Sequence, residues 1–248
     1  RPFSHNNEEQ NEGENEELLP LIFFHGISPG FSVYVPFING FSKNRSSVIV
    51  EVPHITTSLS FKPTKRENIV QGVAKLCRRH NIKGACVSGH SFGSICTGWV
   101  AKDLPQRVKQ VVLIDPVSLL LCLPDVAYNF LYRKPSTFFE AVIYYICSQE
   151  ITISYSLRRH FWWYQNVVYI EELTCPTTVV LSSNDEVTHA QAVKESILQY
   201  VDDQHAFHQH TYMNNDTHTL DGHTYNCKHN QKNTETLLDT VAISSKDS

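Results

Sequence analysis

Short apolar, β-rich runs alternate with longer segments of helical periodicity along most of this chain. The expected strands cover residues 19–24, 47–52, 84–88, 108–114, 177–182 and 205–213. The expected helices cover residues 33–41, 65–80, 91–104, 190–201 and 234–243. The run at 111–114 is continuously apolar, which is typical of a strand in a parallel sheet covered on both faces. The alternation predicts an α/β fold in which a mostly parallel sheet is flanked by helices and joined by right-handed crossovers.

The acidic residues are concentrated at the start of the chain. Residues 1–18 hold six acidic residues and one basic residue, with few apolar side chains. Such a segment buries too little surface to offset the entropy lost on ordering, so we expect a disordered acidic lead before a single domain at 19–248. Residues 19–248 carry 20 basic and 19 acidic residues. This near-neutral body lacks the excess positive charge that drives binding to phosphate backbones, so no nucleic-acid partner is expected.

The apolar stretches and the cysteines constrain the compartment only weakly. The longest strongly apolar stretch, around 117–123, is far shorter than the roughly 18–20 residues that span a bilayer, so no transmembrane segment is expected in this chain. The seven cysteines are scattered without a CxxC pair, which is typical of buried free thiols and slightly favours the cytoplasm. Because the chain begins at Arg1, we expect a fragment or processed product, which leaves open whether a targeting or anchor segment lies upstream. The oligomeric state stays open.

The strand and helix rhythm stops between residues 117 and 172. Within this interval, residues 128–169 contain 13 of the 27 aromatic residues of the chain. One interpretation is an inserted helical layer whose rings pack on one another, and a second, compatible one is a lid over an apolar pocket. We therefore expect a helical cap inserted in the domain at about 117–172.

The stretch Gly89-His90-Ser91-Phe92-Gly93 carries the most chemical information. It is a Gly-x-Ser-x-Gly pattern that follows an apolar run and opens a helical segment, which is the context of a nucleophile elbow. Side chains at positions 89 and 93 would collide with the neighbouring strand and helix, while Ser91 would occupy a strained turn with its hydroxyl projecting. Ser91 is therefore the candidate nucleophile. The alternative is a glycine-lined turn that holds an ordinary serine.

A second motif lies upstream, where an apolar run ends in His25-Gly26-Ile27. Acyl transfer generates an oxyanion that must be met by preorganised N–H donors, and a glycine after a strand lets the chain turn sharply towards the serine. The candidate donors are the backbone N–H groups of Ile27 and Phe92. His25 itself is expected to hold the loop rather than to catalyse.

Together with Ile114-Asp115-Pro116 and Ser183-Asn184-Asp185, these motifs resemble those of the α/β-hydrolase superfamily. The resemblance covers residues 19 to about 225 and implies a serine hydrolase with a Ser-His-Asp triad and no cofactor. It also places a cap where residues 117–172 lie. One departure is that the superfamily usually has two or more strands before the His-Gly strand, whereas here only the Glu-rich lead precedes it.

The superfamily order of triad members is serine, then acid, then histidine. The resemblance implies that Asp185 is the acid, in the loop after 177–182, with Asp115 as the alternative that some relatives use. The histidine should lie just beyond the last strand. With that strand at 205–213, the resemblance implies His218, and His223 is the alternative.

The many histidines near the C-terminus raise the question of a metal site. His208 and His210 alternate on the expected strand and could present two imidazoles together. No HExxH motif and no cysteine pair supports them, so no metal site and no cofactor are expected.

The favoured function is cleavage of a carboxylic ester, or a related acyl bond, through an acyl-enzyme. An aromatic, weakly charged cap predicts a small substrate with an apolar, lipid-like part. Two alternatives stay open: a catalytically silent binding or scaffold protein with this fold, and an acyltransferase or thioesterase that uses the same triad.

Overall fold

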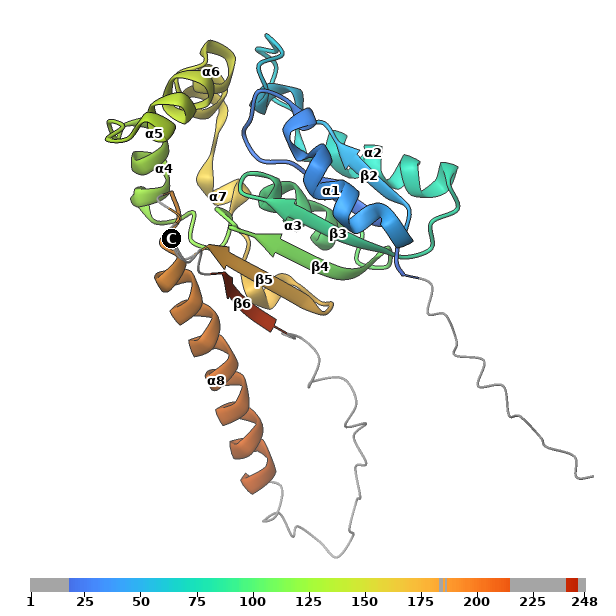
Figure 1. The fold of residues 1–248 in the computed structure, drawn as a ribbon. Helices are drawn as coiled ribbons and strands as arrows, with labels where there is room; N and C mark the ends of the chain where they lie inside the picture. The colour runs from blue at the N-terminus through green and yellow to red at the C-terminus, as the bar shows by residue number, and fades with distance from the viewer. Residues whose placement is uncertain (1–17, 183–184, 186, 215–239, 245–248) are drawn as a thin grey trace, which may run out of the picture.

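A computed structural model describes residues 18–182, 185, 187–214 and 240–244. Its six strands are β1 (Leu21–Phe24), β2 (Ser47–Val50), β3 (Ala85–His90), β4 (Val108–Ile114), β5 (Thr177–Ser182) and β6 (Thr240–Ser244). They form one sheet in the order β2-β1-β3-β4-β5-β6, and every neighbouring pair is parallel (Figure 1). The predicted parallel α/β sheet is confirmed, because helices separate successive strands along the chain.

Helices flank this sheet where the periodicity predicts them. They are the 3₁₀ turns η1 (Phe31–Tyr34), η2 (Ser42–Asn44) and η3 (Pro53–Ile55), and the α-helices α1 (Val35–Phe41), α2 (Arg66–Arg79), α3 (Gly93–Asp103) and α8 (Ala190–Asn214). In α2 the buried residues Ile69, Val73 and Cys77 repeat every four positions, so they share one face. In α3 the residues from Gly93 to Ala101 are all buried, which makes it the central helix of the domain.

Two expectations near the C-terminus are wrong. Residues 205–213, expected as the last strand, belong to α8, and the last strand of the described residues is β6, which overlaps the segment expected as a terminal helix. No Gly or Pro interrupts 190–214, so nothing in the sequence stops the helix that begins at Ala190. Thr240, Val241 and Ile243 are β-branched, which favours a strand. The expected acidic lead lies outside the described residues.

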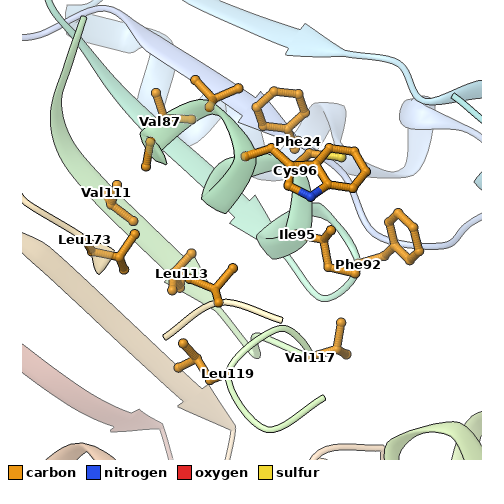
Figure 2. Close-up of a cluster of buried hydrophobic side chains, with 14 of the residues drawn as sticks. Phe24, Val87, Phe92, Ile95, Cys96, Val111, Leu113, Val117, Leu119 and Leu173 are labelled. Atoms are coloured by element: carbon orange, nitrogen blue, oxygen red, sulfur yellow. The ribbon is translucent and has the colours of Figure 1, made fainter. Parts of the chain in front are cut away.

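The main hydrophobic core lies around α3 and the central strands. Figure 2 shows Phe24 of β1, Val87 of β3, Leu113 of β4 and Ile95 of α3 in this cluster. Each of these four side chains is at most 1% exposed. Fully burying an aliphatic or aromatic side chain of this size contributes roughly 1.5–3 kcal/mol. The core therefore fixes α3, and with it the turn between β3 and α3.

The segment between β4 and β5 is helical. Its elements are α4 (Pro124–Leu131), α5 (Phe138–Ile143), the π-helical turn η4 (Tyr144–Ser148), α6 (Ile151–His160), α7 (Trp163–Asn166) and the 3₁₀ turn η5 (Ile170–Glu172). Figure 1 shows α4, α5 and α6 beyond the ends to which the arrows of the central strands point. Several of its aromatic rings are exposed, among them Phe138 at 87% and Tyr145 at 68%.

Among the described residues, no helix combines the length and the apolar character needed to cross a bilayer.

Candidate active site

Ser91 occupies a strained backbone position at the end of β3. Its φ is 51°, in the left-handed region that non-glycine residues seldom adopt. Hydrogen bonds hold it there: its amide donates to the carbonyl of Ile114 (2.9 Å), and its carbonyl accepts from the amide and the hydroxyl of Ser94 (3.0 and 2.6 Å). A residue kept in such a conformation by its surroundings is typical of a functional turn.

The two glycines of the motif are required by packing. A Cβ at Gly89 would lie 2.3 Å from the carbonyl oxygen of Gly93, and a Cβ at Gly93 would lie 2.1 Å from that of Phe24. Both neighbours are backbone atoms that cannot rotate away. The expected collisions at positions 89 and 93 are therefore present in the structure.

The loop after β1 reaches the elbow. A Cβ at Gly26 would lie 3.0 Å from the Cβ of Ser91, so only a glycine lets the loop approach so closely. Neither the amide of Ile27 nor that of Phe92 has a hydrogen-bond acceptor among the residues that the structure describes. Free amides on both sides of a serine are what an oxyanion hole requires.

His25 has the holding role expected for it. Its Nδ1–H donates to the carbonyl of Gly26 (2.8 Å), and its Nε2 accepts from the amide of Val52 (3.0 Å). The ring is fully buried, and burial lowers the pKa of His25, so it is neutral at pH 7. His25 thus ties the loop after β1 to Val52, two residues beyond β2.

Tyr34 and His90 extend this network, and sequence reasoning missed both. The Tyr34 hydroxyl accepts from the amide of Gly26 (3.1 Å) and donates to Nδ1 of His90 (2.9 Å). The Nε2 of His90 lies 4.0 Å from Oδ2 of Asp115. Burial raises the pKa of Tyr34 to about 12 and lowers the pKa of His90, so both groups are neutral at pH 7. His90 stood in the motif, but Tyr34 belongs to η1, 56 residues away, and the sequence holds no signal that pairs them.

Both candidate acids lie near this network. Asp115 follows β4 with φ 44°, and its carboxylate accepts from the amide (2.6 Å) and the hydroxyl (2.9 Å) of Ser182. Asp185 accepts from the amide of Val187 (2.8 Å) and from the amide and hydroxyl of Thr188. Both carboxylates raise the pKa of His90 against the effect of burial. The structure therefore brings Ser91, the two free amides and both acids to the carboxyl edge of the sheet.

The candidate bases His218 and His223 lie outside the described residues. The strand at 205–213 from which their spacing was counted is helical, and in this sequence no histidine follows β6. Both assignments therefore stay predictions from triad order alone. The pairing of His208 with His210 loses its basis, because residues two apart on a helix do not share a face. In the described part of the chain, no three His, Cys, Asp or Glu side chains cluster as metal ligands would.

A large cleft begins one residue from the nucleophile. It has a volume of about 920 Å³ and lies between the start of α2, α3 and the α6–α7 region. Phe92, Trp99, Phe161 and Trp162 supply much of its apolar wall, whereas Ser91 is not part of its lining. A cleft of this size is typical of a small-molecule site.

No family model matches the chain. One curated relative, the (E)-2-((N-methylformamido)methylene)succinate hydrolase of Acinetobacter baylyi, is 26% identical over 110 residues, or 44% of this chain. The match spans 40% of the length of that relative.

Solved structures are similar to this chain in fold, although their sequence identity to it is low. A probable hydrolytic enzyme from Pseudomonas aeruginosa aligns with a TM-score of 0.51 at 16% identity, covering 70% of this chain and 67% of its own. An α/β hydrolase enzyme from a sediment metagenome of the Mar Chica lagoon aligns with a TM-score of 0.51 at 17% identity, covering 73% and 75%. The parallel sheet, the elbow after β3 and these alignments agree: the chain has the α/β-hydrolase fold.

Proposed function

We propose that this protein is a serine hydrolase in which Ser91 is the nucleophile. One observation carries the proposal: Ser91 is held at φ 51° at the end of β3, beside the free amides of Ile27 and Phe92. The similar proteins described above are hydrolases by name, which supports hydrolytic chemistry in general. The serine mechanism and the ester substrate are our own inference.

The proposed reaction has two stages. The Ser91 hydroxyl oxygen attacks the carbonyl carbon of the ester, and the base, His218 in our assignment, takes the hydroxyl proton. The amides of Ile27 and Phe92 donate to the oxyanion, and the base returns the proton to the leaving alcohol. Water then attacks the acyl-enzyme by the same route, which releases the acid and restores Ser91. Asp185 orients the imidazole and stabilises its charged form.

The proposed substrate has an apolar part. Aromatic side chains supply much of the apolar surface of the cleft beside Phe92, and burying apolar area there contributes about 25 cal/mol per Å². We also propose that residues 117–172 act as a cap over the site, since α6 and α7 supply one wall of this cleft. The acyltransferase and thioesterase alternatives share the attack on Ser91 and differ in the acceptor or the leaving group.

A second candidate function is a catalytically silent binding or scaffold protein. One observation favours it: the cleft beside the elbow is lined by Phe92 but not by Ser91. In this case Ser91 would be a strained turn without an activating partner.

Labelling with a broad fluorophosphonate probe separates the two candidates. We expect the wild-type protein to be labelled, and the label to be lost in Ser91→Ala and in one of His218→Ala and His223→Ala. Ser32→Ala, at an exposed serine in η1, is the control and should label like wild type. A folded wild-type protein that takes no label would contradict the serine hydrolase and support the silent binding protein. Circular dichroism of each variant verifies its fold.

A further inference from the structure

The cleft beside the elbow is lined by both aromatic and charged side chains. Trp99, Phe161 and Trp162 line the wall, and Phe92 lies 5.9 Å from Phe161 between ring centroids. Figure 2 shows Phe92 at the margin of the buried cluster, away from Val111 and Leu113. An aromatic wall of this kind accommodates a flat or alkyl body through offset and edge-on ring contacts.

The most buried titratable side chain of the lining, His54, is uncharged at neutral pH. His54 is 6% exposed, its Nδ1 accepts from the amide of Thr64 (3.2 Å), and its ring meets Phe92 edge-on at 5.7 Å. Burial lowers the pKa of His54 to about 4, so the ring is neutral at pH 7. Among the cations of the lining, Lys62 and Lys65 are exposed, and we take them to mark the mouth of the cleft.

Those residues give the mouth a positive balance. Arg66 is paired with Asp103, and Lys102 with Glu172. Lys62 and Lys65 line the cleft, are exposed, and have no acidic partner among the residues that the structure describes. The one further acid in the lining is Glu67, so with the two ion pairs neutral the two lysines outnumber this single acid. Two unpaired ammonium groups above an aromatic wall complement an apolar anion.

We propose that this cleft binds a small apolar carboxylate, such as an arylalkanoate, with its body against Trp99, Phe161 and Trp162 and its carboxylate between Lys62 and Lys65. The cleft is the one in which we place the apolar part of the substrate, but this proposal does not rest on the serine mechanism, because Ser91 is absent from the lining and no bond is made or broken. A carboxylate at the mouth gains charge-assisted hydrogen bonds, while a cation there meets like charge. The site thus distinguishes ligands by the sign of their charge.

The first test compares three ligands with the same body in isothermal titrations of the full chain at pH 7. We expect 4-phenylbutyrate to bind roughly tenfold more tightly than 4-phenylbutan-1-ol, and 4-phenylbutylammonium to bind most weakly. Tryptophan fluorescence should change on binding, because Trp99 and Trp162 line the cleft. Equal affinities for the three ligands, or no binding of the carboxylate, would overturn the proposal.

Matched variants locate the site. Replacing Lys62 and Lys65 by Gln should weaken 4-phenylbutyrate binding roughly tenfold, whereas the same change at Lys75 and Lys83, exposed and outside the lining, should leave it unchanged. All four positions are exposed, so the variants are expected to fold. If both double variants lost the same affinity, general surface charge rather than the cleft would explain the binding, and the proposal would fail.

The aromatic wall has its own matched pair. Trp162 and Trp163 are neighbours, 55% and 48% exposed, but only Trp162 lines the cleft. Trp162→Ala should weaken binding of 4-phenylbutyrate several-fold, and Trp163→Ala should not. Ser91→Ala should bind the ligand like wild type, so this result is independent of whether the fluorophosphonate probe labels Ser91. An equal loss in the two tryptophan variants would contradict the site.

Discussion

The elbow after β3 holds the proposed nucleophile, and the loop after β5 holds the proposed acid. The two are kept in place in different ways. At the elbow, Gly89, Ser91 and Gly93 meet backbone atoms of β1, β4 and α3 at close range. After β5, Asp185 is held by the loop itself, through the amides of Val187 and Thr188. The elbow is therefore specified by contacts between elements, whereas the position of the acid depends on a local turn.

From this difference we expect the elbow and the loop after β5 to tolerate substitutions to different degrees. Any side chain at position 93 would displace β1, so the elbow cannot change without changing the core. Among the residues that the structure describes, the hydrogen bonds to the Asp185 carboxylate come from positions two and three residues ahead in the same loop. The proposed chemistry thus combines a nucleophile fixed by contacts between elements with an acid held by a local turn.

The acid assignment gives the largest expected effect. Asp185→Asn should lower the rate of ester hydrolysis by roughly 10⁴-fold, because an amide neither orients the imidazole correctly nor stabilises its charge. Asp115→Asn should lower the rate less than about tenfold. It should instead cost about 1–2 kcal/mol of unfolding free energy, because the two Ser182 donors lose a carboxylate. Initial rates with a 4-nitrophenyl ester and urea unfolding measure the two quantities, and the reverse pattern would make Asp115 the acid.

The packing of the elbow gives the next largest effect. Gly93→Ala should destabilise the protein by at least about 3 kcal/mol, because the new Cβ would meet the Phe24 carbonyl oxygen. Gly72→Ala in α2 is the matched control, since a Cβ there meets nothing within 4 Å. It should stabilise the helix by about 0.5–1 kcal/mol. Urea unfolding followed by circular dichroism tests both variants. A Gly93→Ala protein as stable as wild type would contradict the contrast between the elbow and the loop after β5.

Sequence reasoning works where neighbours in the chain impose the structure. A strand, two glycines around a serine and a helix lie within 20 residues, so the elbow and its strained serine are predictable from local pattern. The Tyr34 and His90 contact joins two elements 56 residues apart and has no local signal. The strand expected at 205–213 failed for another reason: its polar residues fit two periodicities, and the absence of Gly and Pro lets α8 continue through it. The position of the base was counted from that strand, so the assignment of His218, with His223 as the alternative, lost its structural basis.

Lowering the pH should reduce the free energy of unfolding, because His54, which packs against Phe92 of the elbow, is buried in its neutral form. In the unfolded chain His54 gains a proton below about pH 6.5, but in the folded protein only near pH 4. The unfolded state binds more protons between these values, so stability should be complete above pH 6.5 and fall as the pH approaches 4. The loss from His54 is roughly 3 kcal/mol. Urea unfolding at pH 7 and pH 4.5 measures this change, and His54→Gln should show a flatter pH dependence than wild type. An unchanged slope in that variant would assign the acid sensitivity to other groups.

Tyr34 gives the smallest effect and shows how closely the oxyanion loop depends on its support. Tyr34→Phe removes the acceptor of the Gly26 amide and the donor to His90 without emptying the ring position. It should cost about 1–2 kcal/mol of unfolding free energy and, since Ile27 follows Gly26, lower kcat roughly tenfold with little change in KM. Tyr132→Phe is the control, because Tyr132 is 55% exposed and Arg158 contacts its ring rather than its hydroxyl. That variant should stay within about 0.5 kcal/mol of wild type with unchanged kcat. If Tyr34→Phe lost stability but kept full kcat, the Tyr34 hydroxyl would support the fold alone, and the oxyanion loop would be held by His25.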